Sequence, residues 1–306
     1  MIKSMGNMQI WTVGCVAVLI TLNANAKINL TLDILGLRED GYHEVAMVMQ
    51  EVSLHDTLSM EKSGGGIQLS ITIEGQDGVL PADESNLCWK AAALVQREYG
   101  LTEGVSMELV KRIPMAAGLA GGSADAAAVL KGMNQLYGLG MTEERLCELG
   151  ARLGSDIPFC LLGGTMLATG RGEVLTRLPS FPETYVVLAK PEAGVSTAWA
   201  YKTYDAGYDG PHPDNEAMLK AIGEGDRRKA AGLLCNVLEG ITIKEHAIIE
   251  SYRKMMLKQG AMASMMSGSG PTVFGLAEDE ASAGRIAAAV KALDDKAAVY
   301  VAKTVA

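Results

Sequence analysis

The chain has 306 residues and a net charge of −9, with 48% hydrophobic and 21% charged residues. This length predicts two domains, and a chain of this size buries a sizeable core without disulfides or a structural metal. The sequence contains no long basic run, which excludes sequence-independent binding of nucleic acid. Such an acidic chain binds a polyanion only locally, through backbone N–H groups, a helix N-terminus, a metal ion and a few lysines.

Five cysteines and four histidines are dispersed along the chain. No C-x-x-C pair occurs among the cysteines, which are Cys15, Cys88, Cys147, Cys160 and Cys235. This dispersal argues against a disulfide framework or a structural zinc site. It indicates free thiols in a reducing compartment, for which we expect the cytoplasm.

The N-terminal sequence has two interpretations. Lys3 precedes an apolar run over residues 10–22, and Ala24, Asn25 and Ala26 follow, which is the order of a secretory signal and would suit a secreted binding protein. The run is too short for a transmembrane helix. We favour a leading segment followed by a first β-strand, because residues that prefer strands are frequent in the run.

Strands are expected early in the chain, where apolar residues alternate or turn residues intervene. They fall within residues 19–58, with a turn at 38–41, and at 67–73 and 105–113. Asp83 or Ser85 is expected to cap a helix that runs to Glu98. Two more helices are expected, over residues 124–137 and after Thr142.

The second half of the chain mixes strands and helices without strict alternation. Strands are expected at 185–189, 272–276 and 298–302, and helices around 216–239, 244–259 and 281–293. This mixture favours an α+β fold over a doubly wound sheet. We expect an N-terminal domain over residues 1–180, with an extension over 1–18, and a C-terminal domain over 181–306.

A run of small residues joins an expected strand to an expected helix. It consists of Pro114, Met115, Ala116, Ala117, Gly118, Leu119, Ala120, Gly121, Gly122 and Ser123. Small residues let the backbone approach a ligand, and the following helix offers free N–H groups and a positive dipole end to a phosphate. The Ser123 hydroxyl suits a phosphate oxygen or a metal ion. A plain strand-to-helix connection needs fewer small residues, so this run predicts a phosphate-binding loop.

Asp156 precedes an apolar run. A lone Asp in this position is usually a helix N-cap. The alternative is a catalytic carboxylate, because a kinase that acts on an alcohol needs a group to orient or deprotonate the hydroxyl.

Lys27 and Asn29 share one face of an expected strand. That face is either exposed to solvent, or it presents a lysine that keeps a carboxylate ionised and stabilises developing charge. The residues alone leave both interpretations open.

Two further segments have ambiguous roles. Tyr42 and His43 follow the Asp-Gly turn and suit stacking on a planar base, although a plain hairpin explains them equally well. The glycine-serine turn at 267–270 is either a hairpin or a backbone lid over a phosphate or substrate.

Taken together and in this order, these segments resemble the GHMP kinases, the superfamily named for galactokinase, homoserine kinase, mevalonate kinase and phosphomevalonate kinase. Its members share a polar N-terminal strand, a central glycine loop and a C-terminal glycine turn. Residues 26–30, 40–44, 114–123 and 154–158 resemble most a branch whose acceptor is a cytidyl-linked methylerythritol. The resemblance runs from Ile20 to the end of the chain.

The resemblance implies transfer of the γ-phosphoryl group of ATP to the 2-hydroxyl of that acceptor, in the non-mevalonate route to isoprenoid precursors. ATP and Mg²⁺ are the implied cofactors. The implied partner is a small molecule with a cytidine diphosphate group, bound by a monomer or homodimer that needs neither nucleic acid nor membrane. The implied fold is an N-terminal domain like domain 2 of ribosomal protein S5 and a ferredoxin-like C-terminal domain, with the site between them.

The same resemblance assigns roles to individual residues. Lys27 and Asp156 match the catalytic pair, and residues 114–123 match the ATP loop. Asn29, Tyr42 and His43 match substrate-side positions, with Tyr42 and His43 at the cytosine. Apart from the resemblance, we expect Thr197 on the substrate side, and Tyr201 or Trp199 beside the cytosine. No residue is assigned as a metal ligand.

The sequence departs from the family pattern at two places. Alanine stands at positions 116, 117 and 120, where relatives are often richer in glycine, and we expect the loop to keep its function. The first 18 residues have no clear counterpart.

Two other functions are alternatives to this kinase activity, and the residues argue against both. The first is a homoserine kinase, which has no use for a base-stacking pair such as Tyr42 and His43. A non-catalytic nucleotide sensor has no need of both Lys27 and Asp156.

Overall fold

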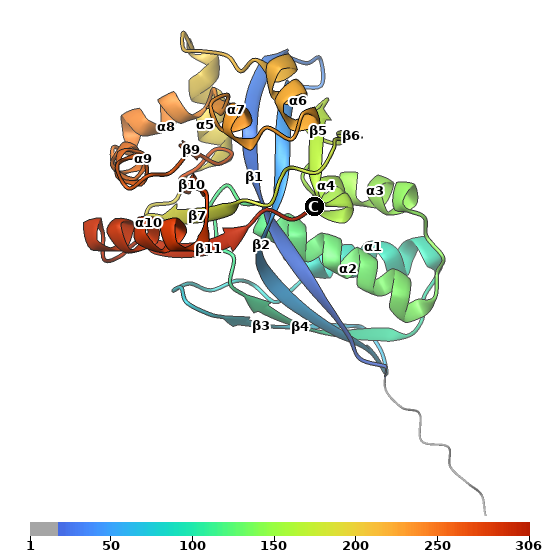
Figure 1. Ribbon diagram of the computed structural model, residues 1–306. Coiled ribbons are helices and arrows are strands. Elements are labelled where there is room, and N and C mark those ends of the chain that lie inside the picture. Colours follow the sequence, from blue (N-terminus) through green and yellow to red (C-terminus); the bar gives the residue numbers. More distant parts are fainter. Residues whose placement is uncertain (1–17) are drawn as a thin grey trace, which may run out of the picture.

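Two long antiparallel strands form the centre of the molecule, β1 (Ile20–Leu37) and β2 (His43–Ser63) (Figure 1). The computed structural model describes residues 18–306, so the predicted extension over 1–18 lies, apart from Val18, outside the described residues. Ala24 and Ala26 are buried inside β1, which confirms that a strand forms here.

The first sheet has seven strands, in the order β3-β4-β2-β1-β8, with β5 paired to β2 and β6 to β5. Its other members are β3 (Ile67–Ile73), β4 (Gly104–Lys111), β5 (Thr165–Thr169), β6 (Val174–Arg177) and the short β8 (Cys235–Asn236). β8 follows the first six strands by a long stretch of chain, yet it pairs in parallel with β1. A segment from the second half of the chain thereby takes part in the first sheet.

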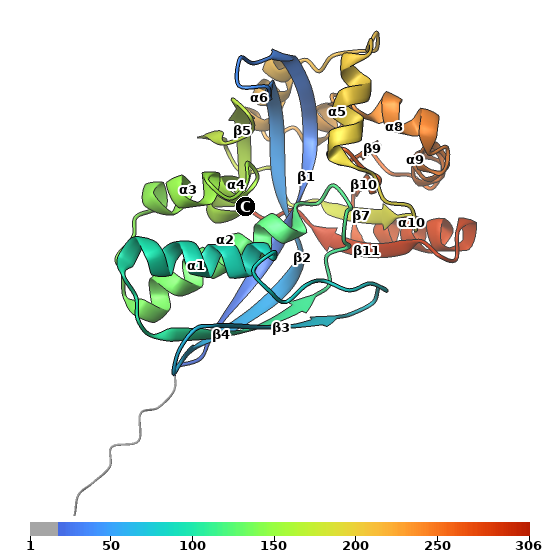
Figure 2. The ribbon, with the colours of Figure 1, turned by 180° about the vertical axis from the view of Figure 1, so that it is seen from behind.

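Helices pack beside this sheet on one side (Figure 2). They are α1 (Leu87–Tyr99), α2 (Gly121–Tyr137), α3 (Glu143–Ala151) and α4 (Ile157–Leu162). Alanines of α2 are buried against Leu58 and Met60 of β2, and Gly132 leaves room for the Met60 side chain. Small side chains thus let α2 pack closely on the sheet and fix where its N-terminus lies.

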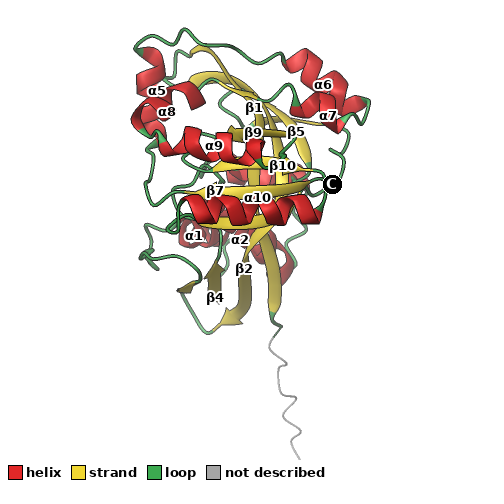
Figure 3. Ribbon diagram, turned by 60° about the vertical axis from the view of Figure 1, so that its left-hand side comes forward, coloured by secondary structure: helices red, strands yellow, loops and turns green. Residues whose placement is uncertain are grey.

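The second sheet has four antiparallel strands in the order β11-β7-β10-β9. They are β7 (Tyr185–Lys190), β9 (Ala263–Met266), β10 (Val273–Ala277) and β11 (Ala298–Lys303). Helices α9 (Ile248–Lys258) and α10 (Glu280–Leu293) cover one face (Figure 3). Counted along the chain, the strands stand in the order 4-1-3-2 of a βαββαβ unit, which confirms the ferredoxin-like prediction.

Between β7 and α9 the chain forms α5 (Thr197–Asp205), α6 (Asn215–Gly223), α7 (Arg227–Ala231), β8 and α8 (Glu239–Glu245). A strand at Cys235–Asn236 therefore replaces part of the helix expected around 216–239. The N-cap of α1 is Asn86, not Asp83 or Ser85. Asp83 instead accepts hydrogen bonds from Ser85 in the turn that leads into the helix.

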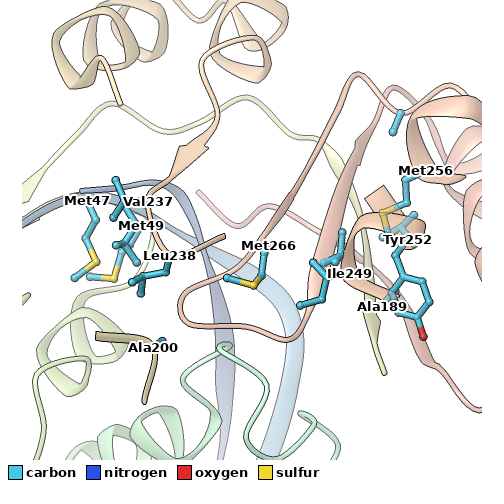
Figure 4. Packing of buried hydrophobic residues seen from close by; sticks show 14 of the residues in the cluster. Met47, Met49, Ala189, Ala200, Val237, Leu238, Ile249, Tyr252, Met256 and Met266 are labelled. Carbon is cyan, nitrogen blue, oxygen red and sulfur yellow. The ribbon is translucent and has the colours of Figure 1, made fainter. Parts of the chain in front are cut away.

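One hydrophobic core extends across both sheets. Met47 and Met49 of β2 lie beside Val237 and Leu238, and Met266 of β9 lies between Leu238 and Ile249 (Figure 4). The two halves therefore hold each other in place, while the boundary at residue 180 stays a prediction. Among residues 18–306, no helix is long and apolar enough to cross a membrane.

Candidate active site

The loop over 114–123 connects β4 to α2, and α2 begins inside it at Gly121. The N-cap residue is Ala120, and no side chain caps the helix. The N–H groups of the first turn have no carbonyl partner within a helix, so those of Gly121, Gly122 and Ser123 are available to a ligand. A phosphate group suits these donors and the positive end of the helix dipole.

Backbone strain is concentrated in this loop. Ala116 has φ +48° and Ala120 has φ +56°, and these are the only non-glycine residues with positive φ in the described part of the chain. The left-handed region costs a residue with a Cβ roughly 1 to 2 kcal/mol. Strain that persists in one segment is typical of ligand-binding sites. The alanines therefore adopt the conformation that glycine would take.

The glycine-serine turn at 267–270 packs against the loop. Gly118 has φ +74°, and a Cβ on it would lie 2.2 Å from the Ser267 carbonyl oxygen. The Ser267 hydroxyl donates to the Gly118 carbonyl at 3.0 Å. On the other side, the Lys27 backbone N–H donates to the Leu119 carbonyl at 3.1 Å. These contacts fix the loop between β1 and the C-terminal half.

Lys27 and Asn29 are buried, with 4% and 0% of their surfaces exposed, so the solvent-face interpretation is wrong. Lys27 Nζ donates to Asn29 Oδ1 at 2.5 Å. Gly268 lies against this pair, because a Cβ on it would be 3.6 Å from Asn29 Oδ1. The ammonium group is thus fixed beside both glycine segments.

Asp156 stands at the N-cap position of α4, with φ −81° and ψ −12°, but its side chain makes no capping hydrogen bond. The carboxylate instead lines the cavity together with Lys27. Burial, and to a smaller extent the charge of Asp156, raises the pKa of the Cys160 thiol, whereas Lys27 lowers it. Lys27 and Asp156 therefore both lie near enough to Cys160 to change its pKa, although within residues 18–306 they form no direct ion pair with each other.

The predicted base-binding residues also meet. The His43 ring lies 4.9 Å from the Tyr201 ring, and His43 Nε2 is 2.7 Å from Asp205 Oδ1. Burial, together with the charge of Asp156, raises the pKa of Tyr201 to about 12, so its phenol is neutral at ordinary pH. Tyr42 stays 55% exposed. The His43 and Tyr201 rings thus form a wall that suits a planar base, and Tyr42 lines the same cavity.

A single cavity of about 1020 Å³ contains almost all predicted site residues. It is lined by the whole loop 114–123 and by Lys27, Tyr42, His43, Asp156, Thr197 and Tyr201. Asn29 is not among the lining residues and lies behind Lys27. Thr197 Oγ1 and Ser269 Oγ lie 3.0 Å apart, which ties the start of α5 to the glycine-serine turn.

Other residues of the cavity had no sequence signal. Parts of the segment before and at the start of α1 line it, namely Leu80, Pro81, Ser85, Asn86 and Leu87. Met115 also lines it, and the Met115 N–H donates to Gln76 Oε1 at 3.0 Å. Asp205, Lys202 and Arg171 also line it. Each is an isolated polar residue in the sequence, and only the tertiary structure brings them together.

A buried charge cluster supports the loop. Lys111 donates to Asp125 at 2.6 Å and also to Asp56, and all three are at most 4% exposed. The other oxygen of Asp125, Oδ1, has no hydrogen-bond partner. Burial raises the pKa of Asp125 to about 8. The charge of Lys111 opposes this rise, and the charge of Asp56 adds to it. Two carboxylates thus share one ammonium, which favours retention of a proton.

Comparisons with known proteins identify the family. The GHMP kinases N terminal domain matches residues 86–164, and the GHMP kinases C terminal domain matches 218–296. A 4-diphosphocytidyl-2-C-methyl-D-erythritol kinase of Acetivibrio thermocellus is 48% identical over 86% of this chain and 92% of its own length. The chain belongs to this family of GHMP kinases. A relative of the same name from Bacillus pumilus is 47% identical over 86% of this chain and 90% of its own.

Solved structures agree with the assignment to this kinase family. A 4-(cytidine 5'-diphospho)-2C-methyl-D-erythritol kinase superposes with a TM-score of 0.79 at 34% identity, over 94% of this chain and 100% of its own. A homoserine kinase from Cytophaga hutchinsonii superposes with a TM-score of 0.75 at 21% identity, over 97% of this chain and 98% of its own, and shares the fold. The predicted superfamily, fold class and ATP-dependent kinase activity are confirmed, and the family favours this branch over homoserine kinase.

Proposed function

We propose that the chain transfers the γ-phosphoryl group of ATP to the 2-hydroxyl of 4-diphosphocytidyl-2-C-methyl-D-erythritol. The observation that carries this proposal is the single cavity, which holds a phosphate loop, an uncapped Asp156 carboxylate and an aromatic wall for a base. Family membership supports it, since the relatives at 48% and 47% identity bear this name.

In this proposal the loop binds ATP. Backbone N–H groups of Gly121, Gly122 and Ser123 donate to the phosphates, and the absence of a capping side chain leaves them free to do so. Mg²⁺ fits as an ion carried by the ATP phosphates, with the Ser123 hydroxyl at the cavity wall as a candidate oxygen ligand. The ion would supply charge neutralisation at the transferred group.

Asp156 and Lys27 are proposed to act on the acceptor. Asp156 orients or deprotonates the alcohol, and Lys27 stabilises the charge that develops on the transferred group. Asn29 holds the Lys27 ammonium in place at 2.5 Å. Since both catalytic groups are fixed by secondary structure, the main contribution of the protein is positioning.

Tyr42, His43 and Tyr201 are proposed to bind the cytosine, and Thr197 to contact the substrate near the glycine-serine turn. The close approach of the His43 and Tyr201 rings supports this role, since it places two polar aromatic groups on one cavity wall. We also propose that the protein is a monomer or homodimer in the cytoplasm. Residues 1–180 would bind ATP, and residues of 181–306 would complete the binding site for the acceptor.

An ADP-release assay tests the function. Wild-type protein with ATP and Mg²⁺ is offered the cytidyl-linked methylerythritol, homoserine or mevalonate at equal concentrations. We expect ADP release with the first acceptor to exceed that with the others by orders of magnitude. Faster turnover of homoserine or mevalonate would overturn the proposal.

A further inference from the structure

Arg171 lies in the turn between β5 and β6, at the wall of the cavity. The turn is anchored to the start of β2, because the Val45 N–H donates to the Gly170 carbonyl at 2.8 Å and the Gly170 N–H donates to Glu44 at 3.1 Å. Tyr42 and His43 immediately precede these anchors. The position of Arg171 relative to the aromatic wall is thereby fixed.

The guanidinium group of Arg171 stands over the Tyr42 ring, 4.9 Å from its centroid. Its Nε makes a long contact of 3.4 Å with Glu173, and the side chain is 32% exposed. Within residues 18–306, its two terminal nitrogens donate no hydrogen bond. They are therefore available to a ligand in the cavity.

The same turn touches the segment that carries Asp156. A Cβ on Gly172 would lie 3.9 Å from the Ser155 Cβ. The turn that carries Arg171 thus lies beside the residue that precedes Asp156, while the guanidinium group lies over the Tyr42 ring. A ligand that extends from the aromatic wall to Asp156 would lie along this turn.

The proposed acceptor has this extended form, with a diphosphate between its base and its alcohol. If the base stacks at Tyr42 and the hydroxyl reaches Asp156, the diphosphate lies beside the Gly170–Gly172 turn. We infer that Arg171 binds the diphosphate of the acceptor through its terminal nitrogens, while the Tyr42 ring supports the guanidinium plane. This inference rests on the proposed function.

Other cations of the cavity are less suitable. Lys111 is held by Asp56 and Asp125, and Lys27 by Asn29. Lys202 lines the cavity on α5, but an ammonium group lacks the planar fork that binds two phosphate oxygens at once. Arg171 therefore combines free donors, suitable geometry and the expected position.

A binding experiment on the full chain separates charge recognition from packing. Dissociation constants for CDP and for cytidine are measured by calorimetry with wild type, Arg171→Gln and Lys202→Gln. We expect Arg171→Gln to weaken CDP binding roughly ten- to a hundredfold, which is the range for a lost charge-assisted hydrogen-bond pair, and to change cytidine binding less than about twofold. Arg177→Gln, an exposed arginine on β6 outside the cavity, is the matched control and keeps both constants.

Two results would overturn the inference. Equal weakening of CDP and cytidine would show that Arg171 only supports the Tyr42 ring. A loss of CDP binding in Lys202→Gln but not in Arg171→Gln would place the diphosphate at α5. Failure of the proposed function looks different, because wild type would then bind neither CDP nor cytidine while phosphorylating another acceptor.

Discussion

At the scale of single residues, the unusual feature of Asp156 is that it occupies an N-cap position without capping. An N-terminal Asp normally satisfies N–H groups of the first helical turn and contributes about 1 kcal/mol. Here ψ is −12°, in the helical region, and the carboxylate turns to the cavity. Helix capping therefore does not explain the Asp at this position, which supports the proposed catalytic role of its carboxylate.

Asp156→Asn is expected to lower turnover by roughly 10²- to 10⁴-fold, because the amide cannot accept the proton of the alcohol. ATP affinity and melting temperature should stay near wild type, since no capping hydrogen bond is lost. ADP release, nucleotide titration and thermal unfolding measure the three quantities. Near-wild-type turnover would show that Asp156 is not the base.

Asp125 gives a prediction on pH. Its folded pKa of about 8 lies above the ordinary value of 3.8 because the group is buried. The folded state therefore binds the proton more tightly, and this stabilisation is complete below about pH 4 and lost as pH rises to about 8. Burial lowers the pKa of Lys111, but the charges of Asp125 and Asp56 outweigh it and raise that pKa above its ordinary value, so Lys111 stays charged across this window.

Asp125→Asn should remove this pH dependence, because an amide does not ionise but still accepts from Lys111. The melting temperature of the variant minus that of wild type should increase between pH 5 and pH 8.5, measured without nucleotide. A constant difference over that range would mean that Asp125 is ionised in the folded protein throughout.

At the scale of elements, the phosphate loop and the glycine-serine turn act as one unit. Each approaches the other so closely that neither Gly118 nor Gly268 has room for a side chain without displacement of the other backbone. The sequence predicted that the loop binds a phosphate, and it left the glycine-serine turn as either a hairpin or a backbone lid over a ligand. The structure adds a direct contact between the loop and the turn, which no local sequence pattern predicts.

Gly118→Ala tests this contact. The new Cβ meets the Ser267 carbonyl at 2.2 Å in a left-handed backbone, so strain of roughly 1 to 2 kcal/mol is joined by a clash of about 1 to 3 kcal/mol. We expect lower stability and weaker ATP binding. Gly140→Ala is the control, because Gly140 has φ +66° but nothing within 4 Å. Equal effects of the two variants on ATP affinity would refute a role for the contact.

Long, periodic elements were predictable from the sequence, and short non-local ones were not. The strands β3 and β4 and the helix α10 follow their patterns closely. The local pattern predicted a helix where β8 lies, but this two-residue strand pairs with β1 from a distant part of the chain, and such a long-range contact leaves no local pattern. The β5–β6 hairpin was missed in the same way.

The residues of the candidate site also fall into two groups, those with a local sequence signal and those without one. Glycine-rich and capping positions have local signals, so the loop and Asp156 could be singled out from their residue patterns, whereas a role for Lys27 followed only from the resemblance to GHMP kinases. Arg171 owes its position to the pairing of its turn with β2, and Asp125 on α2 owes its environment to Asp56 of β2 and Lys111 of β4. Such residues carry no signal until the sheet is assembled.

At the scale of the whole molecule, the two halves are joined by chain segments that cross from one sheet to the other. β8 pairs with β1, and Thr304 beyond β11 bridges to Val52 of β2. Gln50 of β2 donates to the Val305 carbonyl at 2.7 Å. The cavity is lined by both halves, so its shape depends on these contacts between the sheets.

Asn236 of β8 is the strongest test of this coupling. Its side chain donates to the carbonyls of Met266 at 2.9 Å and Gly268 at 2.8 Å, and it accepts from the Leu238 N–H at 3.0 Å. Asn236→Ala leaves these buried groups unsatisfied and should cost roughly 2 to 4 kcal/mol of unfolding free energy. ATP affinity should also fall, because the turn that Asn236 holds is the one that closes on the phosphate loop.

Asn215→Ala is the matched control for this prediction. Asn215 is also an amide that ties the C-terminal half to β1, since it accepts from Thr31 at 2.6 Å, but it does not touch the glycine-serine turn. We expect Asn215→Ala to lower the free energy of unfolding and leave ATP affinity unchanged. Denaturant unfolding and nucleotide titration measure both quantities. If the two variants weaken ATP binding equally, the effect comes from general loosening of the molecule, and the glycine-serine turn has no specific part in holding the nucleotide.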